Sequence, residues 1–127
     1  MTTFKMEIVT PSGKVYDKEV KYASIPGKQG EFGVLPGHSA LVTLLSPGVI
    51  EIEEVDGNKE GVAINWGYVE VNENKVTVLA DRAVAVYGKT DSDLAKALDE
   101  AEKLLESAID SNVALASAKA RIQQYGR

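Results

Sequence analysis

Few residues of this sequence could do chemistry by themselves, and its single histidine, His38, is one of them. The chain has no cysteine, which excludes disulfides, thiolate metal sites and thiol catalysis together. A Ser/His/Asp site would have to use His38 as its base. Because His38 follows Pro36 and Gly37 in an expected turn, we interpret it as an exposed contact residue. The sequence predicts no catalytic residue and no metal site.

A second candidate for chemistry is the tripeptide Gly88-Lys89-Thr90, which stands between a predicted strand and a predicted helix. A phosphate-binding loop would occupy such a place. However, Ala83 stands where the first glycine of that motif belongs, and residues 84–87 resemble a strand rather than a loop. We therefore interpret Gly88 as a linker and Thr90 as a helix cap.

The remaining candidates are one tryptophan and two acidic groups. The acidic groups have spacings that suit acid/base pairs, and they are Glu51, Glu53 and Glu54, and Asp99, Glu100 and Glu102. No apolar segment encloses either group, so we expect a solvated strand edge and a solvated helix face. Trp66 could stack on a ligand, but a place in the core or at a strand edge explains it more simply.

Composition and charge restrict the class of protein that must position these residues. The chain has 127 residues, of which 44% are hydrophobic and 26% charged, as expected for one domain with an appendage. A net charge of −5 is the wrong sign for binding nucleic acid or anionic lipid. The N-terminus lacks a signal-peptide pattern, and the apolar runs are short, so we expect no direct membrane insertion.

The first part of the chain, residues 1–88, predicts a β-sandwich. Turn sequences rich in Gly, Pro, Asn and Asp separate short segments with β-branched residues and alternating polarity. These segments are 4–9, 14–25, 31–35, 40–45, 49–55, 61–66, 68–71, 75–79 and 82–87. Many short strands without intervening helices indicate a flattened antiparallel sandwich.

The second part, residues 89–127, predicts an antiparallel two-helix hairpin, so the fold class is mainly β plus α. Ten of the eleven glycines and all four prolines lie at or before Gly88. Beyond it, leucine and alanine recur at three- and four-residue steps from Leu94 to Ile109, and the pattern restarts near Ser111. Helices of this length are marginal alone. The hairpin must therefore pack on its own sandwich or on another protein.

Charge is divided unevenly within the hairpin. Residues 91–110 hold two basic and seven acidic side chains, whereas residues 111–127 hold three basic side chains and no acidic one. The two helices should attract one another when folded together. In an extended state Lys119, Arg121 and Arg127 would become free to meet an acidic partner surface.

Five segments of the chain resemble the signature segments of the epsilon subunit of bacterial F-type ATP synthase. They occur in the order found in that family, and the resemblance extends over the whole chain. The segments are IVTPSG at 8–13, GEFGVLPGHSAL at 30–41, PGVI at 47–50, GYVEV at 67–71 and VTVLAD at 76–81.

The resemblance implies a flattened sandwich of about ten strands followed by the helix hairpin. It also implies a non-catalytic subunit without a cofactor, in the central rotor stalk of the proton-transporting ATP synthase. Its partners would be the gamma subunit, the ring of c subunits and the alpha/beta catalytic head. Its place would be peripheral, on the cytoplasmic side of the bacterial cell membrane. It would transmit rotation between proton flow and ATP synthesis, and its hairpin would oppose ATP hydrolysis.

The resemblance also suggests which residues meet partners. The loop at 27–33 and the turn at 36–38 present Lys28, Glu31 and His38, and by resemblance this end meets the polar loops of the c-ring. Glu31 is the best single contact candidate. Some relatives bind ATP through the pattern Ile/Leu-Asp-x-x-Arg-Ala, and the matching segment, 92–97, retains Asp93 but has Lys96 in place of arginine. Because lysine offers only a point charge, Asp93 and Lys96 are weak candidates for nucleotide binding.

Two further classes of function stay open from the residues alone. A free-standing β-sandwich could bind a small anion or a peptide, and a hydrolase could use His38. A rotor subunit should co-purify with gamma and the catalytic subunits, whereas a free-standing binding module should purify alone. A hydrolase should lose turnover on His38→Ala.

Overall fold

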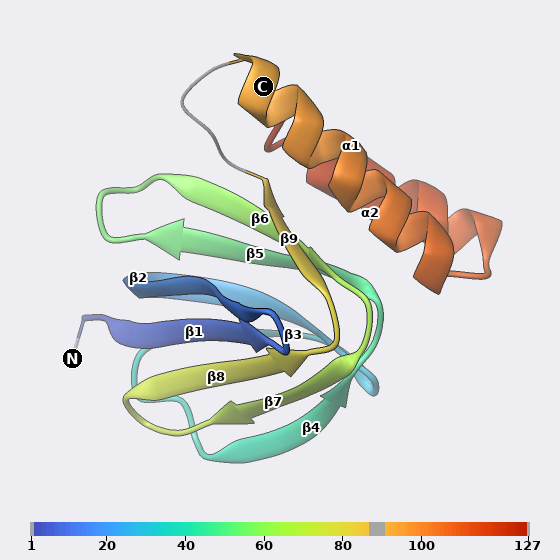
Figure 1. Ribbon diagram of the computed structural model, residues 1–127. Helices are drawn as coiled ribbons and strands as arrows, with labels where there is room; N and C mark the ends of the chain where they lie inside the picture. The colour runs from blue at the N-terminus through green and yellow to red at the C-terminus, as the bar shows by residue number, and fades with distance from the viewer. Residues whose placement is uncertain (1, 87–90, 127) are drawn as a thin grey trace.

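The computed structural model describes residues 2–86 and 91–126, and it confirms a β-sheet body followed by two helices (Figure 1). The strands are β1 (Phe4–Thr10), β2 (Gly13–Gly27), β3 (Gly30–Val34), β4 (Leu41–Leu45), β5 (Gly48–Glu54), β6 (Lys59–Ile64), β7 (Gly67–Val71), β8 (Lys75–Ala80) and β9 (Ala83–Val86). The helices are α1 (Asp91–Ala108) and α2 (Asn112–Gln123). The predicted boundary at residue 88 and the tripeptide at 88–90 lie outside the described residues, so the division into 1–88 and 89–127 stays a prediction.

The long strand β2 belongs to both layers of the sandwich. Its first half pairs antiparallel with β1, with Phe4 opposite Val20. Its second half pairs with β3 and β5, after a register shift between Val20 and Tyr22. A bulge of this kind bends a strand and increases its twist. If the two halves of β2 are counted as separate strands, the nine described strands agree with the expected count of about ten.

The remaining strands complete two layers (Figure 1). One layer has the order β1-β8-β7-β4, and the other places β5, β6 and β9 beside β2. The pairing of β1 with β8 is parallel, with Met6 opposite Val76, and departs from the antiparallel pattern expected from the sequence. Parallel neighbours need a long crossover connection, and here the chain from β2 to β7 supplies it.

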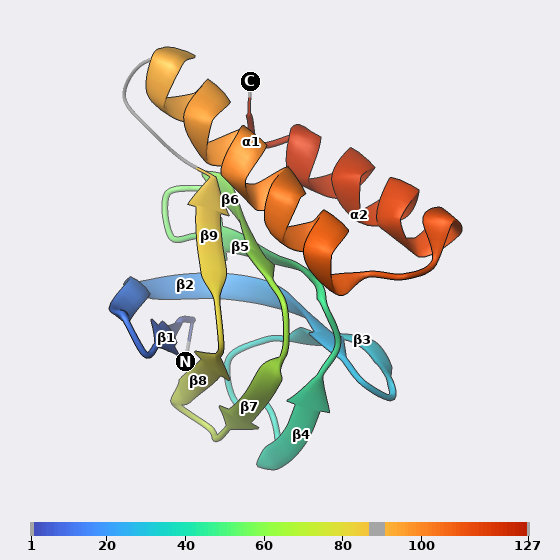
Figure 2. The ribbon, with the colours of Figure 1, turned by 45° about the vertical axis from the view of Figure 1, so that its right-hand side comes forward.

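Parts of β5, β6 and β9 are apolar on both faces, because one face meets the core between the layers and the other meets the helices. Ile50 and Val62 point into the core between the layers, whereas Val49 and Ala63 point outward against the helices. Consecutive apolar residues such as Val49-Ile50 are typical of strands buried on both sides. Figure 2 shows both helices lying over this outer face.

The helices begin where the sequence predicts. Asp91 and Asp93 occupy the first turn of α1, where the helix dipole favours negative charge. The Ser111 hydroxyl caps α2 and accepts a hydrogen bond from the amide of Ala114 at 3.2 Å. The buried residues of α2 are Ala118 and Ile122, while Val113 in its first turn is 82% exposed. The hairpin packs on its own sandwich, the first of the two arrangements left open.

Candidate functional site: the joint between sandwich and hairpin

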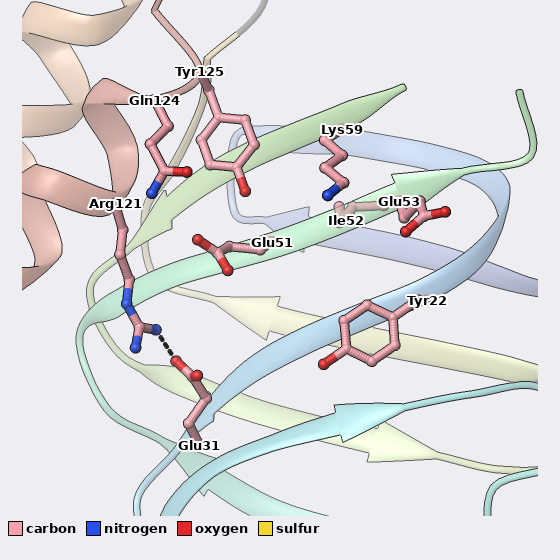
Figure 3. Close-up of a pocket in the computed structure, with 9 residues that line it drawn as sticks. All are labelled: Tyr22, Glu31, Glu51, Ile52, Glu53, Lys59, Arg121, Gln124 and Tyr125. Carbon is pink, nitrogen blue, oxygen red and sulfur yellow. Dashed lines mark hydrogen bonds and ion pairs between the residues drawn. The ribbon is translucent and has the colours of Figure 1, made fainter. Parts of the chain in front are cut away.

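The C-terminal half of α2 meets strands β3 and β5 at an open cavity of about 370 Å³ (Figure 3). The sandwich side of this cavity includes Glu31 and Glu51, and the helix side includes Arg121 and Tyr125. We call this place the joint, and these four residues define it. It is the region where predicted contact residues from both parts of the chain come together.

An ion pair between Arg121 and Glu31 crosses the joint (Figure 3). It connects residues 90 positions apart in the sequence. The hydrogen bond to Glu31 raises the pKa of the Arg121 guanidinium further, so Arg121 is a full cation near neutral pH. Both side chains are about two-fifths exposed, and pairs of this kind contribute about 0–1 kcal/mol. In this conformation Glu31, the predicted c-ring contact, is therefore paired with Arg121, a predicted regulatory cation.

The Tyr125 ring forms the second contact across the joint. It lies directly over Gly61 of β6, where an added Cβ would collide with the ring. Burial, followed by the negative charge of Glu51 and a hydrogen bond to it, raises the pKa of Tyr125 to about 12. The hydroxyl therefore stays protonated and available as a donor. Because Gly61 lacks a side chain, the end of α2 can approach the sheet closely.

The other cations of the tail have different places. Lys119 pairs with Glu106 of α1, and Gln123 donates to Glu102 of α1 at 2.7 Å. These contacts agree with the predicted attraction between the acidic and basic helices. Arg121, by contrast, pairs with Glu31 of the sandwich. Arg127 lies outside the described residues.

The three predicted partner contacts are spread along the molecule rather than gathered. Lys28 lies in the β2–β3 turn, and its amide donates to the carbonyl of Leu44 at 2.8 Å, near the end of β4. His38 follows β3, with its ring centroid 6.5 Å from that of Phe32 and its Nδ1 2.8 Å from the carbonyl oxygen of Ser39. Its turn lies close to the β7–β8 turn, since the Gly37 amide contacts the carbonyl of Glu73 at 3.3 Å. Lys28 and His38 therefore lie near opposite ends of β4.

The two nucleotide candidates lie away from the joint. Asp93 and Lys96 are exposed on the first two turns of α1, at positions one helical turn apart. Their spacing places both on one side of the helix. Neither residue lines the joint cavity.

One surface that the sequence analysis did not single out is an exposed apolar face on β4 and β7. Val42 and Leu44 are 65% and 55% exposed, and Leu44 stands opposite the exposed Tyr68 in the β4–β7 ladder. Trp66 is also more than half exposed, so it is not a core residue. The sequence LVTLL of β4 could have indicated this face, because it is apolar on both sides of the strand. In the structure only Leu45 of this segment is buried. We call Val42, Leu44, Trp66 and Tyr68 the apolar face.

Comparison with known proteins establishes the family. Residues 3–86 match the family model described as the ATP synthase, Delta/Epsilon chain, beta-sandwich domain. The chain belongs to the ATP synthase epsilon-chain family. It is 52% identical to the ATP synthase epsilon chain of a Nitratiruptor species and 54% identical to that of a Sulfurovum species, in both cases over 100% of this chain and 98% of the relative. As a member of this family, the chain is a subunit of an enzyme complex and not its catalytic subunit.

Two solved structures share the fold of this epsilon-chain member. A chain in the cryo-EM structure of the Euglena gracilis mitochondrial ATP synthase, comprising OSCP, F1 and the c-ring, has a TM-score of 0.64 at 24% identity. The match covers 98% of this chain and 76% of that one. A chain from the central stalk and c-ring of the Tetrahymena thermophila enzyme has a TM-score of 0.52 at 15% identity, over 96% and 92% of the two chains.

The described residues add two observations on ligands and membranes. They contain no group of three or more His, Cys, Asp or Glu residues placed to hold a metal ion. Neither α1 nor α2 is both long enough and apolar enough to cross a bilayer.

Proposed function

We propose that this chain is a central-stalk subunit that couples rotation of the c-ring to ATP synthesis in the alpha/beta head. Full-length identity of about half to named epsilon chains supports the proposal. The two solved relatives of the same fold belong to an F1/c-ring complex and to a central stalk with its c-ring. In such a complex the chain would be peripheral, on the cytoplasmic side of a bacterial cell membrane.

The apolar face is the observation that carries this proposal. It lies on the β4–β7 layer, away from the layer that the helices cover (Figure 1). Exposed apolar side chains that gather on one face of a sheet mark a protein interface. Aromatic anchors such as Trp66 and Tyr68 are typical of the central part of such interfaces. We assign this face to the gamma subunit.

The contact with the c-ring is assigned to Lys28, Glu31 and His38. Glu31 is paired with Arg121 in the folded conformation, but an exposed pair is weak enough for a partner to replace. Lys28 and His38 extend the contact surface in both directions along β4. This arrangement presents charged and polar groups, as binding to polar loops requires.

The hairpin is assigned a regulatory role in which it leaves the sandwich and approaches the catalytic head. Release would free Lys119, Arg121 and Arg127 for an acidic surface. Asp93 and Lys96 offer nucleotide only weak contacts, so we expect millimolar or weaker ATP affinity. Deleting residues 111–127 should raise ATP hydrolysis of the reconstituted complex and leave assembly intact.

The central test is affinity purification of a tagged chain from its own cells. The unchanged chain should capture gamma, c and the catalytic subunits, whereas Leu44→Asp should lose gamma because it places a charge in the apolar face. Val55→Asp is the matched control, since Val55 is equally exposed but lies in the β5–β6 turn. Capture of gamma by Leu44→Asp at the level of the control would contradict the assignment. Purification of the unchanged chain alone would favour the free-standing binding module.

The c-ring assignment has a separate test. The double variant Glu31→Ala/His38→Ala should lose little stability, because neither side chain is buried and the exposed Glu31–Arg121 pair contributes only about 0–1 kcal/mol. It should weaken association with the c-ring and reduce proton-driven ATP synthesis. Unchanged synthesis and assembly would show that these residues are not the contact.

A further inference from the structure

A pair of carboxyl groups at the far end of the β5–β6 hairpin has no place in the proposed coupling function. Ile52 of β5 stands opposite Glu60 of β6, so Glu54 is the diagonal neighbour of Glu60 on the same face of the sheet. Diagonal neighbours are within reach of long side chains. Glu54 is only 8% exposed and Glu60 is half-buried. Two carboxyl groups therefore share a site that water reaches poorly.

Glu54 is held in its ionised form by two donors from β2. Its Oε2 accepts a hydrogen bond from the Tyr16 hydroxyl at 2.6 Å and another from Lys18 Nζ at 3.1 Å. Burial opposes ionisation of Glu54, but these hydrogen bonds outweigh it and lower the pKa of Glu54. A negative charge therefore stands next to Glu60.

Glu60 lacks equivalent support among the described residues. Its Oε2 is buried without a hydrogen-bond partner, which is costly for a charged oxygen. The other charged groups around it are Lys18, which favours its ionisation, and Glu54 and Asp56, which oppose it. A proton on Glu60 would remove the repulsion and supply an O–H donor to Glu54. Burial, followed by the charge of Glu54, raises the pKa of Glu60 to about 7.

We propose that Glu54 and Glu60 form a proton-sharing carboxyl pair, which fastens the end of the β5–β6 hairpin in its protonated state and loosens it when the proton is lost. Two carboxylates in one poorly hydrated site cannot both be ionised without repulsion. Tyr16 and Lys18 favour a shared proton on Glu60 rather than on Glu54, because both donors point at Glu54.

The pair lies next to the docking site of α2. Gly61 follows Glu60 in β6, and the Tyr125 ring packs against Gly61. Loosening of β6 at Glu60 would therefore reach the contact between Gly61 and Tyr125, which follows α2. We expect the docking of α2 to weaken as the proton is lost.

The direction of the pH effect follows from the raised pKa of Glu60. A carboxyl group whose pKa is higher in the folded protein stabilises the fold fully below its unfolded pKa of 4.5, and this contribution is lost as pH rises toward about 7. Lysines, with their much higher pKa values, do not titrate in this window. A His38→Gln background removes the single histidine of the chain, so no imidazole contributes to the measured pH dependence.

The test compares variants of the full chain in the His38→Gln background. The melting temperature should fall between about pH 5.5 and about pH 8.5, and Glu60→Gln, which mimics the protonated group, should abolish most of that fall. Glu53→Gln is the matched control, since Glu53 lies on the opposite face of β5 beside Lys21 and should keep the fall. An equal fall in Glu60→Gln and in the control would overturn the proposal.

Two measurements on the unchanged chain keep the proposal falsifiable if Glu60→Gln does not fold. Carbon NMR of the side-chain carboxyl groups should show Glu60 titrating near pH 7, and titration close to 4.5 would overturn the shared proton. Hydrogen-exchange protection factors of the α2 amides should fall over the same pH range. Constant protection while Glu60 titrates would overturn the link to α2.

Discussion

The sandwich and the hairpin are built from two apolar clusters of different kinds. The sandwich core is enclosed between two layers of hydrogen-bonded strands, with Met6, Ile25 and Ile50 fully buried. The hairpin has no core of its own, and its buried residues meet outward-facing residues of the sheet such as Val49 and Ala63. One part of the chain is therefore a closed body, and the other depends on a single contact surface.

The difference in burial determines which part can change conformation. Each fully buried aliphatic side chain contributes about 1.5–3 kcal/mol. The hairpin buries Leu104, Leu105 and Ile122 as its large side chains, and ordering two helices opposes that gain. The joint adds an exposed ion pair and the contact of the Tyr125 ring with Gly61. A partner surface can therefore replace the docking of the hairpin, whereas it cannot open the sandwich.

The largest effect should come from the sandwich core. Ile25→Ala removes a fully buried side chain of β2, and we expect a loss of about 2–5 kcal/mol in the free energy of unfolding. Urea unfolding followed by circular dichroism measures it. Val55→Ala, at an exposed turn position, should change stability by less than about 0.5 kcal/mol. Similar losses in both variants would show that the core does not dominate the stability.

A substitution at the second cluster should separate the two parts. Ile122→Ala removes most of the fully buried Ile122 side chain of α2. We expect a loss of about 2–5 kcal/mol in the free energy of hairpin docking. Because isolated helices of this length are marginal, far-UV circular dichroism should show less helix while the urea midpoint of the strands stays in place. If the strands and helices still unfold together at a lower midpoint, the two parts form one cooperative unit.

Removal of the hairpin should affect the sandwich less than a single core substitution. A chain ending at residue 88 keeps the nine described strands and their core, because α1 and α2 add no strand. We expect it to unfold cooperatively, although Val49 and Ala63 become exposed. Loss of a cooperative transition in this shorter chain would contradict a self-sufficient sandwich.

The smallest effect should come from the ion pair across the joint. Arg121→Gln removes the cation that meets Glu31, and we expect a change of about 0–1 kcal/mol in hairpin docking. The effect should shrink as salt screens the charges. Lys103→Gln is the control, because Lys103 pairs with Asp99 within α1. An effect of Arg121→Gln that does not change with salt would show that packing, not charge, acts at this position.

Sequence periodicity predicted the architecture because alternation and three-to-four-residue repeats are local properties. The strands, the restart at Ser111 and the order of sheet before helices all followed from it. The parallel β1–β8 pairing did not, since it depends on the path of the whole chain. The exposure of Trp66 was also missed, because composition does not show which side of an element is covered.

The candidate site was predictable only as separate residues. Glu31 and Arg121 were each singled out, but the pairing of β3 with α2 requires the register of the hairpin on the sheet. The Tyr125 contact depends on Gly61, which gives no signal in the sequence beyond a break in a strand. Glu54 was interpreted as part of a solvated edge, yet Tyr16 and Lys18 cover it from β2.

Native-state hydrogen exchange on the full chain tests the central claim most directly, because it measures the free energy of opening residue by residue. We predict that the amides of α1 and α2 exchange through a partial opening that leaves β2 and β5 protected. Ile122→Ala should lower the opening free energy of both helices and leave that of the strands unchanged. Exchange of the helices and the core strands at one common free energy would contradict a closed sandwich with a reversibly docked hairpin.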